Sequence, residues 1–337
     1  MTPIAPMEAL LAEELPGGAS WQFEPKWDGF RCIAVRSGDD VQLWSKSGKP
    51  LGRYFPEVVA MFGAMRAREF ILDGELLIVA GGAVSFDALQ LRLHPAESRV
   101  RKLSAETPAL FMAFDCLAVG KSMLGSQPLS ERRAALEEML AKACQPALKL
   151  SPATRDRKHA LGWLERTGGA LDGVIAKRLD LPYRPGERAM VKVKQRRTAD
   201  CVVGGFRYGA KGGLVGSLLL GLYDEAGLLH HVGYTSSIAA RDRQAWTDEL
   251  EALVAMPGFT GSAPGGPSRW ATERSTEWQP LKPELVVEVL YDQVTAGRFR
   301  HGTKLLRRRP DKAPRQCTME QLAPPLTPSQ LEQLMRA

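Results

Sequence analysis

The chain of 337 residues is 44% hydrophobic and 25% charged, with a formal net charge of +7, which is ordinary for a water-soluble globular protein with room for two domains. No apolar run approaches the roughly 18 residues needed to cross a bilayer, and glutamates interrupt the N-terminus where a signal peptide would be apolar. The five cysteines are scattered without a CxxC pair, which argues against a disulfide framework or a zinc site and favours a reducing cytoplasm.

The most informative stretch covers residues 24–31 and reads Glu-Pro-Lys-Trp-Asp-Gly-Phe-Arg. It places Lys26 in what we expect to be a tight, glycine-containing turn, with a carboxylate two residues away on each side. A lysine amine is a nucleophile only when it is deprotonated, so a reactive lysine needs neighbours that lower its pKa or hold it against its target. Lys26 is therefore a candidate nucleophile, although the same pattern alone also fits a solvated turn.

Short β-rich runs alternate with helical stretches in the first part of the chain. Residues 32–36 and 41–44 predict one hairpin, and residues 70–79 and 83–86 predict a second. Residues 130–144 have the apolar spacing of an amphipathic helix, with Ser130 as a plausible N-cap. We expect an antiparallel α+β domain over residues 1–197.

Further short motifs follow in this domain. Asp73 and Glu75, within Leu-Asp-Gly-Glu-Leu, should face the same side of a strand because side chains alternate along it. Phe-Met-Ala-Phe-Asp over residues 111–115 and Leu-Asp-Gly-Val-Ile-Ala-Lys over residues 171–177 come next. Lys192 and Lys194 then alternate on a strand, and two ammonium groups on one face would favour a neutral lysine close by.

The composition changes near residues 198–200, which makes this segment a candidate hinge. Glycine-punctuated β-rich runs follow over residues 201–206, 217–223 and 228–234, then a helix near residues 238–254 and a strand over 285–291. This set of strands with one helix fits an OB-fold, a small barrel widely used on nucleic acid. We expect an all-β OB-fold domain with one helix over residues 198–337, where a proline-rich tail leads into a short terminal helix.

The basic residues concentrate near the C-terminus. Residues 298–315 contain eight lysines and arginines against one acid, Asp311. Such a run indicates contact with phosphates when it lies beside a phosphate-handling motif, and otherwise a solvated face.

In their order and intervals, these motifs resemble those of the covalent nucleotidyltransferases, which comprise DNA ligases, RNA ligases and mRNA capping enzymes. Arg-Arg-Arg-Pro-Asp-Lys over residues 307–312 matches an element near the C-terminus of the ATP-dependent DNA ligases. The chain is similar over nearly its whole length to the short bacterial enzymes of the ligase C branch. The resemblance implies an α+β adenylation domain followed by an OB-fold domain.

The resemblance also implies the reaction. A lysine attacks the α-phosphate of ATP and releases pyrophosphate, AMP passes to the 5′-phosphate of a nick, and the 3′-hydroxyl displaces AMP. Lys26 is then the nucleophile, and Lys192 and Lys194 are catalytic residues that stabilise charge on the α-phosphate.

Other positions match residues that bind the nucleotide in this family. Glu24 matches the group that reaches the adenine amino group, Phe114 the ring that stacks on adenine, and Arg31 the side chain that holds the ribose and the nick terminus. A surface carboxylate is the alternative for Glu24, and core packing is the alternative for Phe114. Lys46 stands where relatives usually carry arginine, so it keeps the charge but loses the bidentate fork, and Lys177 belongs to the motif of Asp172.

The remaining matches concern metal and pyrophosphate. Glu75 matches a carboxylate near the ribose and the metal, and Asp172 occupies a position where relatives generally carry a metal-binding glutamate. Arg309 and Lys312 match residues that clasp the leaving pyrophosphate, which requires their domain to close over ATP and then to swing away.

We therefore expect ATP as AMP donor, Mg²⁺ or Mn²⁺, and nicked duplex DNA as substrate. We also expect a monomer in the cytoplasm, associated with the nucleoid, with DNA-repair proteins as possible partners and no membrane partner. Two alternatives stay open: an RNA ligase, RNA-tolerant ligase or capping enzyme, and a nick-binding protein that kept the fold and lost the chemistry.

Overall fold

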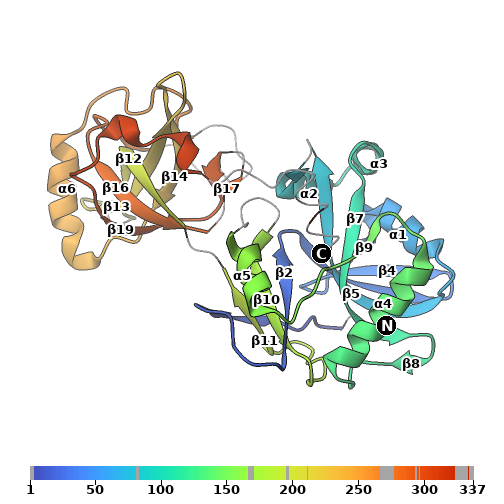
Figure 1. The fold of residues 1–337 in the computed structure, drawn as a ribbon. Helices are drawn as coiled ribbons and strands as arrows, with labels where there is room; N and C mark the ends of the chain where they lie inside the picture. Colours follow the sequence, from blue (N-terminus) through green and yellow to red (C-terminus); the bar gives the residue numbers. More distant parts are fainter. Residues whose placement is uncertain are drawn as a thin grey trace. The chain divides into compact units, whose positions relative to one another are not determined.

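The computed structural model describes residues 4–80, 83–165, 171–194, 197–210, 212–265, 277–292, 294–295, 297–322 and 333. The chain divides into two compact units, the first containing residues up to Gln195 and the second running from Arg196 to Pro324 (Figure 1). Each unit has its own hydrophobic core.

The first unit is built on two β-sheets. One sheet has the strand order β1 (Ala9–Ala12), β11 (Met190–Val193), β10 (Leu171–Arg178) and β2 (Trp21–Trp27). The other has the order β4 (Asp40–Ser45), β3 (Phe30–Ser37), β5 (Glu69–Ala80), β7 (Ala109–Val119) and β8 (Ser122–Met123), with β6 (Ala83–Val84) on β5 and β9 (Leu148–Leu150) on β7. Most neighbours are antiparallel, while β1 with β11 and β9 with β7 are parallel.

Helices flank these sheets in the first unit. They are α1 (Pro56–Gly63), α2 (Phe86–Arg92), α3 (Glu97–Glu106), α4 (Leu129–Ala143) and α5 (Arg157–Glu165), with a short 3₁₀ turn at Gly52–Tyr54. The predicted hairpin of residues 32–44 is present as β3 and β4. In the second predicted hairpin Ala83 and Val84 pair with β5, and the Ser85 N–H still donates to the carbonyl of Ile78. The strand ends there because the Ser85 side chain caps α2 and Phe86 begins that helix.

The predicted amphipathic helix is α4, but Ser130 is not its N-cap. The helix begins at Leu129, Pro128 occupies the capping position, and no side chain caps this end. The backbone N–H groups of Leu129 and Ser130 instead donate to the carbonyls of Leu181 and Leu179. A tertiary contact thus satisfies the donors that a capping side chain usually takes.

Alternation along β5 separates its two faces. Phe70, Leu72, Leu76 and Ile78 pack into the core that includes Phe55 and Phe62 around α1. Ile71 and Leu77 belong to other clusters that contain residues of both sheets. Asp73 and Glu75 have the same parity as Ile71 and Leu77, so the strand carries them between the sheets.

Arg36 of β3 fastens α1 to the second sheet. Its buried guanidinium donates to the carbonyls of Phe62, Gly63, Met65 and Ala67 at 2.6–3.0 Å, and also to that of Gly38. These include the last carbonyls of α1, which have no partner within the helix.

The described residues of the second unit form mainly one antiparallel sheet, with one α-helix along its outer side. The strand order is β14 (Leu229–Thr235), β13 (Val215–Tyr223), β12 (Arg197–Tyr208), β16 (Val286–Tyr291) and β19 (Lys304–Arg308), with β15 (Gln279–Pro280) on β12. A separate pair is formed by β17 (Val294–Thr295) and β18 (Arg298–Phe299), and short 3₁₀ turns lie at Ala240–Asp242, Pro314–Gln316 and Met319–Gln321. Thr235 at the end of β14 pairs with Thr303, the residue before β19.

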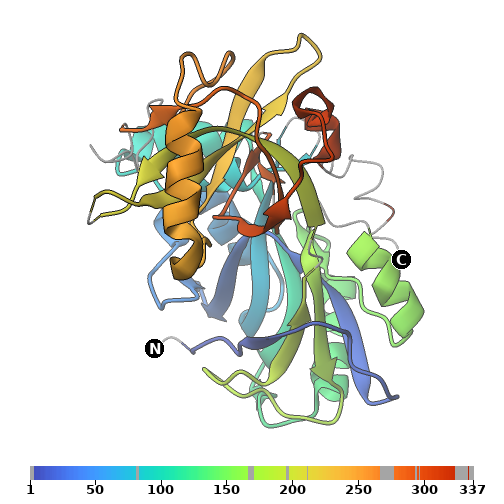
Figure 2. The same cartoon turned by 90° about the vertical axis from the view of Figure 1, so that its left-hand side faces the viewer.

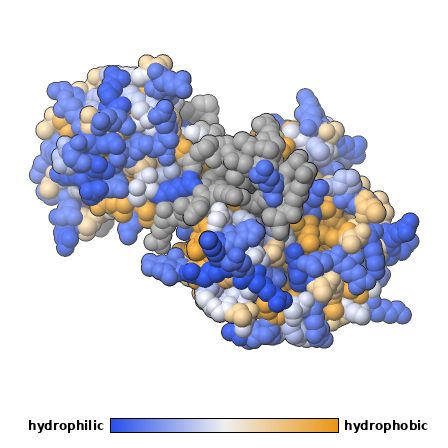
Figure 3. Space-filling model, viewed as in Figure 1, coloured by the Kyte–Doolittle hydropathy of each residue, from blue (hydrophilic) through white to orange (hydrophobic). Residues whose placement is uncertain are grey.

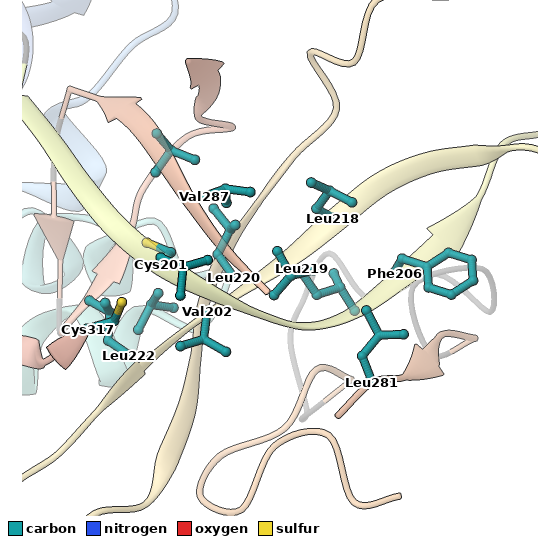
Figure 4. Packing of buried hydrophobic residues seen from close by; sticks show 14 of the residues in the cluster. Cys201, Val202, Phe206, Leu218, Leu219, Leu220, Leu222, Leu281, Val287 and Cys317 are labelled. Carbon is teal, nitrogen blue, oxygen red and sulfur yellow. The ribbon is translucent and has the colours of Figure 1, made fainter. Parts of the chain in front are cut away.

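The core of this unit uses both faces of its strands. Leu218, Leu219 and Leu220 are consecutive in β13 and all fully buried, and they pack with Val202 and Phe206 of β12 (Figure 4). Helix α6 (Arg243–Ala252) adds its buried residues to the same core and lies along the sheet (Figure 2). The visible face of each unit is mostly hydrophilic (Figure 3).

Two predicted features of the second unit are the hinge near residues 198–200 and the short helix at the C-terminus. Thr198, Ala199 and Asp200 are paired with β16 inside β12, and the two units divide just before them, between Gln195 and Arg196, so a hinge near this segment stays a prediction. The expected terminal helix after the proline-rich segment lies outside the described residues. Within the described part of the chain, no helix is long and apolar enough to cross a membrane.

Candidate active site

A cavity of about 1160 Å³ lies in the first unit and gathers most of the predicted site residues. It is lined by segments from both sheets, including Ala9 at the start of β1, and by residues 6–8 before that strand. The predicted residues at its wall are Glu24, Lys26, Arg31, Lys46, Glu75, Phe114, Lys177 and Lys192.

Lys26 lies where the chain passes from one sheet to the other. It is the penultimate residue of β2, not part of the turn, and only Asp28 and Gly29 separate β2 from β3. Its Nζ contacts Oδ2 of Asp172 at 2.6 Å, and Nζ of Lys194 contacts the same oxygen at 2.9 Å. Two of the three predicted catalytic lysines thus meet at one carboxylate.

Gly173 makes this meeting possible. Its φ of +142° lies in a region that favours glycine, and a Cβ atom there would stand 2.1 Å from the carbonyl oxygen of Val193. The glycine after Asp172 therefore lets β10 approach the backbone that carries Lys194.

Lys192 is half-buried at the cavity wall, as the alternation of β11 requires. Burial lowers the pKa of its ammonium group, and the positive charges of Lys26, Lys194 and Lys46 lower it further, while Asp172 opposes them. Lys192 therefore lies within electrostatic reach of Lys26 and Lys194, and the catalytic role of the three lysines stays a prediction.

Glu24 is a buried residue of β2, so it is not a surface carboxylate. Its Oε2 atom pairs with Nζ of Lys177 at 2.8 Å, and its Oε1 atom accepts a hydrogen bond from Gln22 at 2.8 Å. Both oxygens have donors, which compensates for the burial of the charge.

Phe114 faces the cavity although its neighbours in β7 enter the core. Phe111 and Ala113 belong to the core around α1, whereas Phe114 is in none of the described hydrophobic clusters. Its ring centre lies 4.5 Å from the guanidinium carbon of Arg31 and 4.6 Å from Nζ of Lys177. This environment suits a ring at a binding surface more than one that only fills the core.

Arg31 is held by an extended network. Its Nε and Nη2 atoms donate to the two oxygens of Asp73, both at 2.6 Å, and Asp73 is fully buried. The Tyr183 hydroxyl donates to Asp73 at 2.6 Å and accepts from the backbone N–H of Met7 at 2.8 Å. The network fixes Arg31 at the cavity and ties the N-terminal segment to it.

Glu75 lies beside Arg31 at the cavity wall. Burial raises the pKa of its carboxyl to about 7, and Asp73 and Asp28 act in the same direction, while Arg31 and Lys26 oppose the shift. Gly29 allows the close packing here, because a Cβ atom at this position would lie 2.7 Å from Cγ of Glu75.

Lys46 is the most exposed of the predicted residues at the wall. Its side chain is 61% exposed and pairs with Glu8 at 3.2 Å. A single flexible ammonium in this setting is compatible with a weaker role than that of the arginine it replaces.

Arg309 and Lys312 belong to the second unit. Nη1 of Arg309 contacts Oδ1 of Asp200 at 2.8 Å, and Nζ of Lys312 lies 3.2 Å from Oδ2 of Asp200. Nε and Nη2 of Arg309 donate to Asp311, which holds the pKa of the Asp311 carboxyl down at about 2. Arg307 pairs with Glu288 and Arg308 with Glu249.

Comparison with known proteins decides which family carries this arrangement. Residues 6–194 match the family model described as ATP dependent DNA ligase domain, and residues 211–312 match that of the ATP dependent DNA ligase C terminal region. The chain belongs to the ATP-dependent DNA ligase family.

Similar proteins agree with this assignment of the ligase. The chain is 46% identical to DNA ligase C2 of Mycolicibacterium smegmatis, with 96% of each chain covered, and 43% identical to DNA ligase C of Mycobacterium tuberculosis, with 98% and 96% covered. A solved structure of mycobacterial DNA ligase D complexed with ATP and MES aligns with a TM-score of 0.50 and 28% identity over 94% of this chain and 98% of that one. The resemblance to the short ligase C branch is confirmed.

Asp172 offers this ligase a place for a divalent cation. Its buried Oδ1 atom has no hydrogen-bond partner, while Oδ2 serves the two lysines. Among the residues that the structure describes, no three His, Cys, Asp or Glu side chains gather as a complete metal site. Mg²⁺ beside phosphates needs only one or two carboxylates, because phosphate oxygens and waters complete its shell. The residues present fit a cation shared with a phosphate.

The motifs missed several residues of the ligase site. Pro6, Met7 and Glu8 line the cavity, and Tyr183 binds Asp73, the partner of Arg31. In the second unit, Asp200 binds Arg309. The signal was weak, because Tyr183 lies 176 residues from Met7 and Asp200 lies 109 residues from Arg309. A buried tyrosine or aspartate has no local pattern that reveals so distant a partner.

Proposed function

We propose that the chain seals nicks in duplex DNA through a covalent AMP on Lys26 and a DNA-adenylate, with ATP as the AMP donor. The observation that carries the proposal is the contact of Lys26 and Lys194 with one oxygen of Asp172, beside a cavity that Lys192 lines. The proposal assigns Lys26 the first bond: Nζ bonds to the α-phosphorus as the bond to the β-phosphate oxygen breaks and pyrophosphate leaves.

The surrounding charges suit this transfer. Lys192 and Lys194 would balance negative charge that develops on the α-phosphate, and Asp172 would orient Nζ of Lys26. Burial lowers the pKa of Lys192 most, and the charges of Lys26, Lys194 and Lys46 lower it further, so several cations lie close together at this wall. A polyphosphate is the ligand class that such a wall attracts.

The nucleoside would occupy the part of the cavity near Phe114. We assign adenine stacking to Phe114, contact with the adenine amino group to Glu24 and a supporting role to Lys177, whose ion pair with Glu24 lies against the Phe114 ring. Arg31 and Glu75 would face the ribose. Lys46 is assigned a phosphate contact at the open side of the cavity.

Asp172 and Glu75 are the residues that would hold Mg²⁺ or Mn²⁺. The unpartnered Oδ1 atom of Asp172 supports this assignment. Such a cation would supply neutralisation of the negative charge on the nucleotide phosphates.

We further infer that residues 198–337 form an OB-fold domain following the adenylation domain of residues 1–197. Strand order β14-β13-β12-β16-β19 and the pairing of Thr235 with Thr303 support it, since this pairing links the two end strands as a closed barrel requires. Arg309 and Lys312 of this domain would bind the leaving pyrophosphate when the domain closes over ATP.

The DNA ligases among the relatives favour nicked DNA as substrate over RNA. Several relatives are named as non-homologous end joining DNA repair proteins, which favours a role in DNA repair with repair proteins as partners. We propose that the protein is a monomer in the cytoplasm and that it associates with the nucleoid. An RNA-tolerant ligase is the second candidate, and sealing assays with DNA and RNA strands would separate the two.

Self-adenylation tests the central assignment. Lys26→Ala should abolish transfer of label from α-labelled ATP to the protein and the sealing of an ordinary nick, and Lys26→Arg should be no better because a guanidinium stays protonated. Lys142→Ala is the control, since Lys142 is an exposed lysine on α4 that pairs with Glu138 and is not among the residues lining the cavity. A labelled adduct on Lys26→Ala would show that another residue is the nucleophile, and no label on the unmodified protein would favour a nick-binding protein without chemistry.

A further inference from the structure

Asp200 joins the two side chains that the proposed function assigns to pyrophosphate. Each of its carboxylate oxygens takes one cation, Oδ1 the Nη1 atom of Arg309 and Oδ2 the ammonium of Lys312. The Asp200 side chain is only 11% exposed. One buried carboxylate therefore sets the spacing of two cations that would otherwise repel each other.

The backbone around Asp200 is fixed as firmly as its side chain. Gln321 accepts from the Asp200 N–H at 2.9 Å and donates to the Asp200 carbonyl at 3.1 Å, so one amide brackets the residue. Ala199 and Cys201 on either side are buried in the core, and Asp200 is paired with Glu288 of β16. The carboxylate thus sits on the rigid sheet, while Arg309 and Lys312 follow the end of β19.

Asp311 contacts Arg309 in a different way. It is 63% exposed, lies two residues away in the same turn, and binds the edge formed by Nε and Nη2. That edge is the one with which arginine grips phosphate in a bidentate manner. A phosphate can replace the exposed Asp311, whereas Asp200 keeps its hold on Nη1.

We propose that Asp200 is a positioning residue that presents Arg309 and Lys312 together to the phosphates of ATP, an inference that rests on the role proposed above for these two side chains. Long cationic side chains lose conformational freedom when they bind, and an anchor that orders them beforehand lowers that cost. The anchor acts only on the step that releases pyrophosphate, because sealing of a nick that already carries AMP releases none.

The test uses the full chain with Asp200→Asn, which keeps the size of the side chain and removes its charge. At saturating ATP the rate of Lys26 adenylation should fall about 10- to 100-fold, with a smaller change in the KM for ATP. Sealing of a pre-adenylated nick should stay within about twofold of the unmodified protein. Asp200→Glu, which keeps the charge, should recover part of the adenylation rate.

Two further variants make the result decisive. Glu249→Gln is the matched control, because it removes a carboxylate that pairs with Arg308 and not with Arg309 or Lys312, and its adenylation rate should not change. Arg309→Ala reports on the underlying assignment and should impair adenylation selectively. If Arg309→Ala is impaired and Asp200→Asn is not, the inference fails while the proposed function survives. If Arg309→Ala adenylates normally, the pyrophosphate role is wrong and the inference falls with it. Equal loss of both steps in Asp200→Asn, with a lower Tm, would mean that Asp200 only supports the fold.

Discussion

The burial of Glu75 makes the stability of the protein depend on pH. It sits at the cavity wall between Arg31 and the close-packed Gly29, where burial raises the pKa of its carboxyl to about 7 against an ordinary 4.5. Between these values the folded state holds a proton that the unfolded chain has released. The free energy of unfolding therefore decreases as the pH rises through this window, and it changes no further from Glu75 above about pH 7.

Glu75→Gln should remove this dependence. At pH 8 the variant should be more stable than the unmodified protein by about 1–2 kcal/mol, since water still reaches part of the Glu75 side chain, and the advantage should disappear near pH 4.5. Urea unfolding across pH 4.5–8 gives the measurement. Parallel stability profiles for the two proteins would contradict the raised pKa of this carboxyl.

At the scale of single elements, the end of α1 depends on a side chain from another strand. Arg36 donates to several carbonyls at and beyond the last turn of α1, where helical residues no longer supply donors. The helix packs Phe62 against Phe70 and Phe111, so its position also shapes the core behind β5 and β7.

Arg36→Met should lower the free energy of unfolding by about 2–4 kcal/mol, because it leaves buried carbonyls without donors. Arg68→Met is the control, since the exposed ion pair of Arg68 with Asp39 should contribute less than about 1 kcal/mol. Chemical denaturation measures both. Similar losses in the two variants would show that the Arg36 hydrogen bonds add little to stability.

The elements also show where sequence was enough. Alternation placed Asp73 with Glu75 and Lys192 with Lys194, because a strand repeats every two residues whatever surrounds it. We expected Lys26 in a tight turn, but it lies near the end of β2. An Asp-Gly pair suits both a tight turn and a crossing between two sheets, so the sequence did not distinguish the two. The change of composition near residues 198–200 lies close to the division between the two units, because composition changes where a domain begins.

For the whole molecule, each unit has the core it needs to fold, whereas the residues predicted for the reaction are divided between the two units. Each unit has its own core, while the predicted nucleotide residues lie in the first and the predicted pyrophosphate residues in the second. The sequence motifs gave the members of both groups. Contacts such as those of Tyr183 and Asp200 were beyond them, because they depend on strands that come together only in the folded chain.

A protein that ends at Gln195 should therefore fold but fail to adenylate itself. We expect cooperative thermal unfolding of this fragment and loss of at least about 100-fold in lysyl-AMP formation, because Arg309 and Lys312 are missing. Calorimetry and transfer of label from α-labelled ATP test the two halves of this statement. Normal adenylation by the fragment would remove the second unit from the first step.

The basic segment of residues 298–315 carries less uncompensated positive charge than its composition suggests. Arg307, Arg308, Arg309 and Lys312 each have an acidic partner within the second unit, so these cations bring their own counter-charges. Nucleic acid releases fewer of its condensed counterions when it binds a cationic side chain that is already paired with a carboxylate than when it binds an unpaired one. The affinity of this segment for nucleic acid should consequently vary with ionic strength less steeply than a count of its lysines and arginines would suggest.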